Sequence, residues 1–189
     1  MNYCKKYSAT KIRIGEVTLS YAFLFHKRMN PDGTEGKYST AVLIPKSNTQ
    51  AVTLINEAVE AAKQAGKTEK FGGKIPANIK TPLRDGDEEH PDDGHYAGMY
   101  FLNCSSDRKP DLKVLENGHL SDALDEDDVY SGAIGAITLT FYPYAVQGNK
   151  GIGCGLGNFV KTKDGERLSG GSTGAEDFAD LTDEDDELA

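Results

Sequence analysis

Long apolar runs, paired cysteines and a secretory leader are all missing from this 189-residue sequence. Because no run of eighteen apolar residues occurs, no membrane-spanning helix is expected. The segment 1–6 has no apolar core, so no secretory signal is expected there. The three cysteines, Cys4, Cys104 and Cys154, are far apart and form no CxxC pair, which argues against a disulfide framework or a zinc site. A reducing cytoplasm is therefore the expected location.

The signatures of nucleophilic catalysis and of phosphate loops are also missing. There is no GxSxG elbow, and the four histidines fall in polar loops or at strand ends. Glycines at positions 151, 153, 155 and 157 are not followed by the Lys-Ser/Thr pair and helix that complete a P-loop. We therefore expect a protein that is not an enzyme and that binds no cofactor and no metal.

One acidic segment keeps a different functional class open. Carboxylates and two histidines crowd the positions between Asp85 and His95, and divalent metals bind such groups. A metal-dependent nuclease that uses this loop is therefore an alternative function. The segment has neither EF-hand spacing nor a helical histidine pair, so a solvated acidic loop is the favoured interpretation.

Net charge is −9, which at first argues against a partner as acidic as DNA. The acidity is concentrated at one end, where eight Asp and Glu residues and no cation lie between Glu176 and Ala189. Residues 1–175 carry 21 Lys and Arg against 22 Asp and Glu. We therefore predict a near-neutral binding domain over residues 1–168, followed by a flexible linker and a disordered acidic tail over residues 169–189.

Short strands between glycine and proline turns dominate the domain. Strands are predicted over 11–19, 38–44, 97–104 and 113–115, and in a long glycine-rich hairpin within 129–168. A phase change near Gly15 indicates a β-bulge. One helix is predicted between the second and third strands, with a cap at 47–49 and an end near Gly66. This order favours a mainly β fold, a barrel of five or six strands that is closed or half-open.

The glycines of the hairpin allow two interpretations. Glycine at every second position from 151 to 157 removes the side chains from one face of a strand. Either another part of the chain packs closely there, or a ligand lies across that face. The sequence leaves both interpretations open.

Aromatic residues interleaved with cations are the remaining pattern. Single-stranded nucleic acid is held in this way, because cations follow the phosphates while bases stack on rings, at about 1–3 kcal/mol per base. We assign Phe23, Phe25, Phe101 and Phe141 to the core and expect the tyrosines at the surface, since a phenol tolerates water. The predicted phosphate contacts are Arg13, Lys27, Arg28, Arg108, Lys109, Lys150, Lys161 and Lys163, and the predicted stacking platforms are Tyr38, Tyr100, Tyr142 and Tyr144.

Several segments, taken in order, resemble the phage-encoded single-stranded DNA-binding proteins. These segments are 130–132, 141–144, 148–152, 155–158 and 164–168, with support from 103–106, 108–110 and the acidic tail. That family, once catalogued as a domain of unknown function, is related to the replication single-strand binders of podophages. The resemblance implies an OB-fold that binds single-stranded DNA during phage replication or recombination, in the cytoplasm of a bacterial host.

The same resemblance implies a role for the tail. The resemblance implies that the tail contacts a replication polymerase, helicase or recombinase; the tail residues assigned to partners are Asp183, Glu184, Asp185, Asp186 and Glu187. Competition with DNA is a separate hypothesis, because the eight tail carboxylates resemble a run of phosphates that could occupy the basic groove. The alternative is a tail that only keeps the protein soluble. No membrane partner is expected, and a homodimer is one compatible assembly. A phage structural or interaction protein, with the glycine-rich hairpin as an assembly edge, is the remaining alternative.

Overall fold

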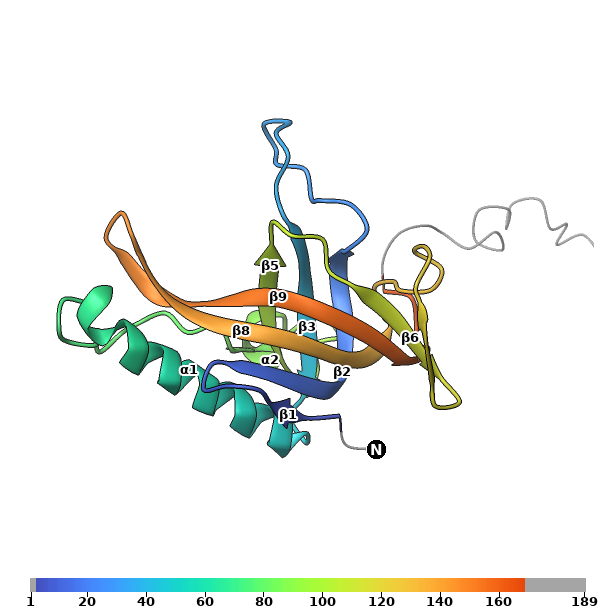
Figure 1. The fold of residues 1–189 in the computed structure, drawn as a ribbon, viewed down its shortest axis with the longest axis horizontal. Coiled ribbons are helices and arrows are strands. Elements are labelled where there is room, and N and C mark those ends of the chain that lie inside the picture. Colours follow the sequence, from blue (N-terminus) through green and yellow to red (C-terminus); the bar gives the residue numbers. More distant parts are fainter. Residues whose placement is uncertain (1–2, 169–189) are drawn as a thin grey trace, which may run out of the picture.

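Five strands close into a barrel in the computed structural model, which describes residues 3–168 (Figure 1). The barrel strands are β2 (Lys11–Phe23), β3 (Tyr38–Pro45), β5 (Met99–Ser106), β8 (Ile134–Val146) and β9 (Asn149–Lys163). They follow the order β5-β3-β2-β8-β9, and a parallel pairing of β9 with β5 closes the ring. A small closed five-stranded barrel of this kind has the OB-fold architecture. The predicted mainly β barrel is confirmed, whereas the predicted tail lies outside the described residues.

The first barrel strand shows why the sequence changes phase. Ile12 and Ile14 face the interior on one side of the irregularity, and Val17 and Leu19 do so on the other. The register with β8 shifts between Ile14 and Val17, and Glu16 lies there with a φ of 55°. The predicted bulge is confirmed, and it keeps the apolar side chains of both halves of the strand inside the barrel.

Aliphatic and phenylalanine side chains from alternate strand positions fill the barrel. Phe141 and Phe159 are among its largest fully buried members. Cys104 and Cys154 are buried among them, and burial raises the pKa of the Cys104 thiol to about 12. Both thiols therefore stay protonated at neutral pH and serve as small apolar side chains.

Helix α1 (Thr49–Glu69) follows β3 and precedes β5 in the sequence, so it lies between the second and third barrel strands in chain order, as predicted. In space it packs against β2 and β8. Asn48 caps it, because its side-chain oxygen accepts a hydrogen bond from the Ala51 amide at 3.2 Å. The predicted end at Gly66 is wrong, since the helix continues to Glu69. Gly66 is buried against Pro143 and Phe71, where any Cβ would collide, so this glycine permits close packing on β8.

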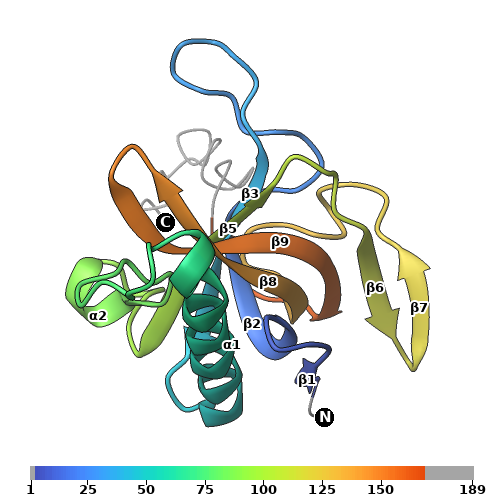
Figure 2. The ribbon, with the colours of Figure 1, turned by 60° about the vertical axis from the view of Figure 1, so that its left-hand side comes forward.

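The polar, turn-rich segment 67–95 contains the end of α1, strand β4 (Arg84–Asp85) and the short helix α2 (Gly86–Glu89). Strand β1 (Lys5–Lys6) extends the sheet beside β2. Strands β6 (Leu112–Glu116) and β7 (His119–Asp122) form a hairpin beside β9 that stands away from the barrel (Figure 2). The sequence did not predict β7, which is exposed throughout. None of the helices in the described part of the chain is long and apolar enough to cross a membrane.

The predicted glycine-rich hairpin is confirmed as β8 and β9, which are joined at Gln147 and Gly148. Both turn residues have positive φ values, 51° and 80°, and a two-residue turn of this geometry matches the twist of its strands. The distal part of this hairpin lies beside the C-terminal end of α1, where Pro143 contacts Gly66 (Figure 1). It forms two barrel strands and also extends one side of the molecule.

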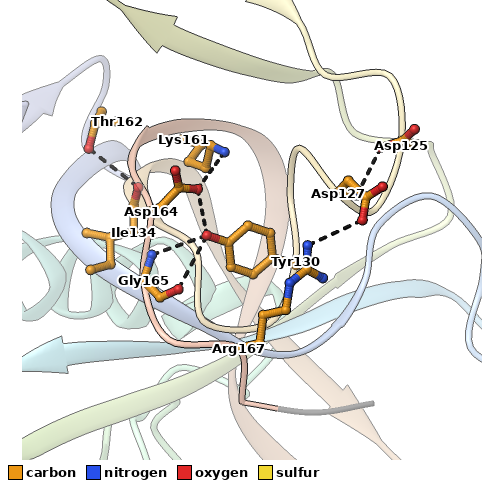
Figure 3. Close-up of polar contacts among 9 residues, drawn as sticks. All are labelled: Asp125, Asp127, Tyr130, Ile134, Lys161, Thr162, Asp164, Gly165 and Arg167. Carbon is orange, nitrogen blue, oxygen red and sulfur yellow. Dashed lines mark hydrogen bonds and ion pairs between the residues drawn. The ribbon is translucent and has the colours of Figure 1, made fainter. Parts of the chain in front are cut away.

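A cluster around Tyr130 holds the chain where it leaves β9 (Figure 3). The Tyr130 hydroxyl donates to Asp164 at 2.6 Å and accepts from the Gly165 amide at 3.2 Å. Asp164 also accepts from Lys161 at 2.8 Å, and this bond lowers the pKa of the Asp164 carboxyl. The Arg167 guanidinium lies 4.3 Å from the centre of the Tyr130 ring. These contacts fix the path of the last described residues.

Candidate nucleic-acid interface

The outer face of the barrel carries a row of register partners with small residues in its middle. In order around the barrel the partners are Phe23, Ser39, Ser105, Gly155 and Thr140. Neighbouring strands are about 4.8 Å apart, so the row extends over roughly 19 Å. These five strands make up the whole ring of the barrel, so the row runs around its outer surface. Two serines and a glycine keep the side chains short in the middle of the row, and we call this surface the small-residue floor.

A groove of about 570 Å³ lies over the β3 and β5 part of this floor. Ala41 and Asn103 are register partners in the adjoining row and extend the floor by one step. The groove wall includes Tyr21, Phe23, Arg28, Arg84 and His90. The outer face of the second and third strands is the surface on which OB-folds bind oligonucleotides.

Two exposed rings stand at the β2 end of the groove. Tyr21 is 60% exposed and Phe23 38% exposed, because the register of β2 with β3 shifts between Ser20 and Phe23 and turns both side chains outward. The assignment of Phe23 to the core is therefore wrong. The Arg28 guanidinium lies 5.7 Å from the centre of the Phe23 ring, so a stacking surface and a positive charge adjoin.

A packed aromatic cluster forms the opposite wall. Phe101 is 2% exposed and meets Tyr96 edge-on, with ring centres 5.2 Å apart. His90 covers both rings. Burial of Phe101 agrees with the sequence prediction, although this ring packs outside the barrel with Leu43 and Tyr96. Arg84 lies over Phe101 at 5.1 Å and is held by Glu89 through bonds of 2.7 and 2.9 Å.

The glycines of β9 have different neighbours along the strand. The Tyr142 and Tyr144 side chains lie over Gly153 and Gly151, where a Cβ would come within 2.4 Å of the Tyr142 ring and 2.5 Å of the Tyr144 hydroxyl. At Gly155 the nearest neighbour of a Cβ would be the Thr140 carbonyl oxygen at 3.3 Å. Cross-strand packing therefore accounts for the first two glycines, whereas Gly155 remains an open part of the floor.

Three of the predicted phosphate contacts already have carboxylate partners. Lys27 lies 3.6 Å from Glu35, and Lys163 lies 3.0 Å from Glu16. The Lys161 side chain is only 12% exposed and binds Asp164 (Figure 3). A phosphate would have to compete with these carboxylates.

The other predicted cations have no carboxylate within ion-pair distance among residues 3–168; they are Arg13, Arg28, Arg108, Lys109 and Lys150. Arg28 lines the groove. Arg108 and Lys109 follow the end of β5, just beyond the floor. Lys150 lies beside the turn of the β8–β9 hairpin, and Arg13 lies on β2 opposite Thr138. The structure thus brings Arg28, but not all five, to the groove itself.

Of the tyrosines predicted to stack on bases, some lie exposed near the floor and others do not. Tyr142 is 44% exposed on the outer face of β8, next to the floor. Tyr38 is partly buried against the core, and Tyr100 lies beside Lys46 at 5.1 Å. Neither of these two lines the groove.

Sequence reasoning missed Tyr21, Asn103, Arg84 and His90 as members of the groove. The Tyr21-Ala22-Phe23 alternation carried a signal, because outward rings at the end of a strand follow from its period of two. Arg84 and His90 carried none, since they reach this face only through β4 and α2.

The acidic loop is organised by a lysine. Lys46 donates to Asp85 at 2.8 and 2.9 Å and to Asp87 at 2.8 Å, and these bonds lower the pKa of both carboxyls. Asp85 also caps α2 by accepting from the Asp87 amide at 2.9 Å. Within residues 3–168 no cluster of three His, Cys, Asp or Glu side chains is arranged to hold a metal ion. The loop is a set of structural ion pairs around α2.

Solved structures share this fold. The single-stranded DNA-binding protein from bacteriophage Enc34, in complex with single-stranded DNA, has a TM-score of 0.71 and 24% identity over 89% of this chain and 98% of that chain. A second structure of the Enc34 protein gives 0.70 and 22% over 95% of each chain. The T7 phage protein gp2.5, a single-stranded DNA binding protein, gives 0.54 and 16% over 96% of this chain and 100% of that chain.

No curated protein sequence matches the chain. A protein family does match, over residues 10–189, and it is described as the ssDNA-binding protein of Enterobacter phage Enc34. The resemblance inferred from the sequence is thereby confirmed. The chain belongs to the Enterobacter phage Enc34 ssDNA-binding protein family.

Proposed function

We propose that this protein binds single-stranded DNA without sequence preference during phage DNA replication or recombination. The small-residue floor carries the proposal, because it offers a surface of small side chains on β3, β5 and β9 between exposed rings on β2 and β8. The family description and the Enc34 structure in complex with single-stranded DNA support it. No bond is made or broken in this activity, so the protein needs no catalytic group.

The groove suggests how the strand is held. Bases stack on Tyr21 and Phe23 at one end of the floor and on Tyr142 at the other, and Arg28 contacts a phosphate near Phe23. Asn103 supplies a hydrogen-bonding side chain in between. Every base has a ring face, so such binding discriminates little between sequences.

The cations near the groove extend the phosphate path. Arg108 and Lys109 would contact the backbone beyond β5, and Lys150 would do so beside the hairpin turn. Lys27, Lys161 and Lys163 would contribute after releasing their carboxylates, and Tyr38, Tyr100 and Tyr144 would contribute stacking only where a ring becomes accessible.

Fluorescence anisotropy across a salt series tests the proposal. Labelled oligo-dT should bind far more tightly than the matching duplex, because duplex bases are not free to stack. The logarithm of the affinity should fall with the logarithm of salt concentration by about 0.7 per phosphate contact. Equal affinity for single strand and duplex, or a lack of salt dependence, would reject the assignment.

We also propose that the acidic tail competes with DNA and, once displaced, recruits a polymerase, helicase or recombinase. Leu168 supports this, because it packs against the Leu43, Tyr96 and Phe101 cluster that forms one wall of the groove. Its amide donates to the Ser131 carbonyl at 3.0 Å. The last described residue therefore lies at the groove wall, and the carboxylates that follow it in the sequence resemble a run of phosphates.

Deletion of residues 175–189 tests the competition. The truncated protein should bind oligo-dT more tightly at low salt, and the difference should shrink as salt rises, because salt screens the tail and the DNA alike. A variant with each tail carboxylate changed to its amide separates charge from chain length. Unchanged low-salt affinity in both variants would contradict the competition.

A further inference from the structure

A second group of cations surrounds an exposed tyrosine in the β1–β2 hairpin. The Lys5 and Lys11 ammonium groups lie 5.0 and 5.4 Å from the centre of the Tyr7 ring. Arg13 donates to the Tyr7 hydroxyl at 3.3 Å. Tyr7 is 44% exposed, so the ring is accessible while three positive charges lie around it. We call these four residues the Tyr7 patch.

The cations of the Tyr7 patch lie close together and are not paired with carboxylates of the described residues. No carboxylate of residues 3–168 lies within ion-pair distance of Lys5, Lys11 or Arg13. Lys6, the next residue along, is by contrast 4.0 Å from Glu57. Like charges held together repel one another, so an anion that bound among them would relieve that repulsion.

The hairpin holds the patch in a defined shape. The amides of Tyr7 and Ser8 both donate to the Lys11 carbonyl, at 2.9 and 3.1 Å. The Ser8 hydroxyl oxygen accepts from the Lys11 amide at 3.0 Å. The Arg13 guanidinium also donates to the Tyr3 carbonyl at 2.6 Å. Tyr7 and Lys11 are therefore fixed relative to each other before any ligand arrives.

The patch continues the small-residue floor around the barrel. Thr140 is the register partner of Gly155 on one side and of Lys11 on the other. Thr140 is itself exposed. Adjacent strands are about 4.8 Å apart, so Lys11 lies one strand beyond Thr140 and roughly 10 Å from Gly155 along the surface. A strand that leaves the floor across Thr140 meets the Tyr7 patch next.

We propose that the Tyr7 patch is a second single-stranded DNA subsite, in which Lys5 and Lys11 contact phosphates and the Tyr7 ring stacks on a base. This subsite rests on the proposed function, because it binds the part of a strand that extends beyond the groove. The family match begins at residue 10, so Lys5 and Tyr7 lie outside it. Short DNA occupies the groove alone, and longer DNA reaches both surfaces.

Two lengths of oligo-dT separate the subsite from the groove. The sites of OB-folds cover about 4–16 nucleotides. An oligonucleotide of about 6 nucleotides lies near the lower limit of this range, and one of about 20 exceeds the upper limit. The triple variant Lys5→Gln, Tyr7→Ala and Lys11→Gln should bind the short DNA as the unaltered protein does. On the long DNA it should lose at least about fivefold in affinity, the lower end expected for one lost stacking contact. Its salt slope should fall by about 1.4, for two lost phosphate contacts.

A charge-matched control is available at the C-terminal end of α1. Lys67→Gln with Lys70→Gln removes the same number of cations, and neither residue has an ion-pair partner within residues 3–168. This control should leave the long-DNA slope unchanged. An equal loss in control and patch variants, or no length-dependent loss in the patch variant, would overturn the subsite.

A groove variant distinguishes failure of the subsite from failure of the proposed function. Phe23→Ala should weaken binding of the short DNA. If Phe23→Ala weakens short-DNA binding while the patch variant behaves normally on long DNA, the subsite is rejected and the groove stands. If Phe23→Ala has no effect on either length, the groove itself is misplaced. Circular dichroism at 25 °C should show the same fold for all three variants.

Discussion

The Tyr142 ring lies over Gly153 on the neighbouring strand, and the same ring leaves Gly155, two residues further along, largely uncovered. The row of glycines therefore mixes positions needed for packing with one that faces the groove. Gly155→Ala should change the free energy of unfolding by less than about 1 kcal/mol, because the one tight approach of its Cβ, 3.3 Å to the Thr140 carbonyl oxygen, requires only a small shift of the strand. The same substitution should weaken oligo-dT binding by raising the floor.

Gly157 supplies the contrast. A Cβ at this position would collide with the Thr138 side chain and come within 2.7 Å of the Thr138 carbonyl oxygen, which is backbone and cannot swing away. Gly157→Ala should therefore destabilise the protein by about 1–3 kcal/mol in urea unfolding. Equal stability losses at 155 and 157 would mean that the whole row serves packing.

Phe23 should contribute to binding and little to stability. The ring is half-exposed on the groove wall, so Phe23→Ala should cost about 1–3 kcal/mol of oligo-dT binding free energy. Its effect on unfolding should stay below about 1 kcal/mol. Leu124→Ala is the matched control, because Leu124 is 81% exposed and lies outside the groove. Anisotropy and urea unfolding on the same preparations give both quantities.

Ion pairing should rank the predicted phosphate contacts. Arg28 has no carboxylate partner in the described chain, whereas Lys163 is paired with Glu16 at 3.0 Å. Arg28→Gln should lower the salt slope of oligo-dT binding by about 0.7. Lys163→Gln should lower it less, because its charge is already partly neutralised. A larger effect at Lys163 than at Arg28 would place the phosphate path at the C-terminal end of β9 and away from the groove.

Acid should release the contacts that Lys46 makes with the acidic loop. Hydrogen bonds from Lys46 hold the pKa values of Asp85 and Asp87 below the usual 3.8. A carboxyl with a lowered folded-state pKa stabilises the fold above its unfolded-state pKa. That stabilisation disappears as pH falls through the lower, folded-state value. The contribution is thus complete at neutral pH and lost below about pH 4.

The variant Lys46→Gln makes this dependence measurable. It should be less stable than the unaltered protein at pH 7, and the difference should shrink in unfolding experiments below pH 4. Lys37→Gln is a suitable control, because Lys37 makes only an exposed pair with Asp107 at 3.8 Å. A stability difference that stayed constant from pH 7 to pH 2 would show that Lys46 acts through packing on Tyr100 instead.

Patterns confined to one strand or one turn were readable from the sequence. The alternation of Ile12, Ile14, Val17 and Leu19 fixed both the first strand and its bulge, and Asn48 marked the start of α1. The helix end predicted at Gly66 was wrong. Glycine often ends a helix, but here its missing side chain allows Pro143 to pack closely against α1. Local signals could not distinguish these two uses of a glycine, since the difference lies in a residue far along the chain.

The groove was less predictable because it is assembled across strands. Arg28 in the groove and Tyr142 next to the floor were predicted from their chemistry. Phe23 was misassigned, because the register shift in β2 that exposes it depends on its pairing with β3. Arg84 and His90 required the position of α2. The aromatic and cationic residues of the sequence were enough to predict the kind of ligand. The position of the groove depends on the register between strands, which the sequence alone did not show.

The closure of the barrel by β9 also has a consequence for synthesis. Strand β2 ends at Phe23, yet its second partner, β8, begins only at Ile134, and β9 must follow before β5 is paired on both sides. At about 5–20 residues per second, a ribosome leaves that edge of β2 open for roughly ten seconds. An open strand edge invites pairing with other chains. The nascent protein therefore passes through an interval in which its earliest strands await the last, and the complete barrel forms only after Lys163 has emerged.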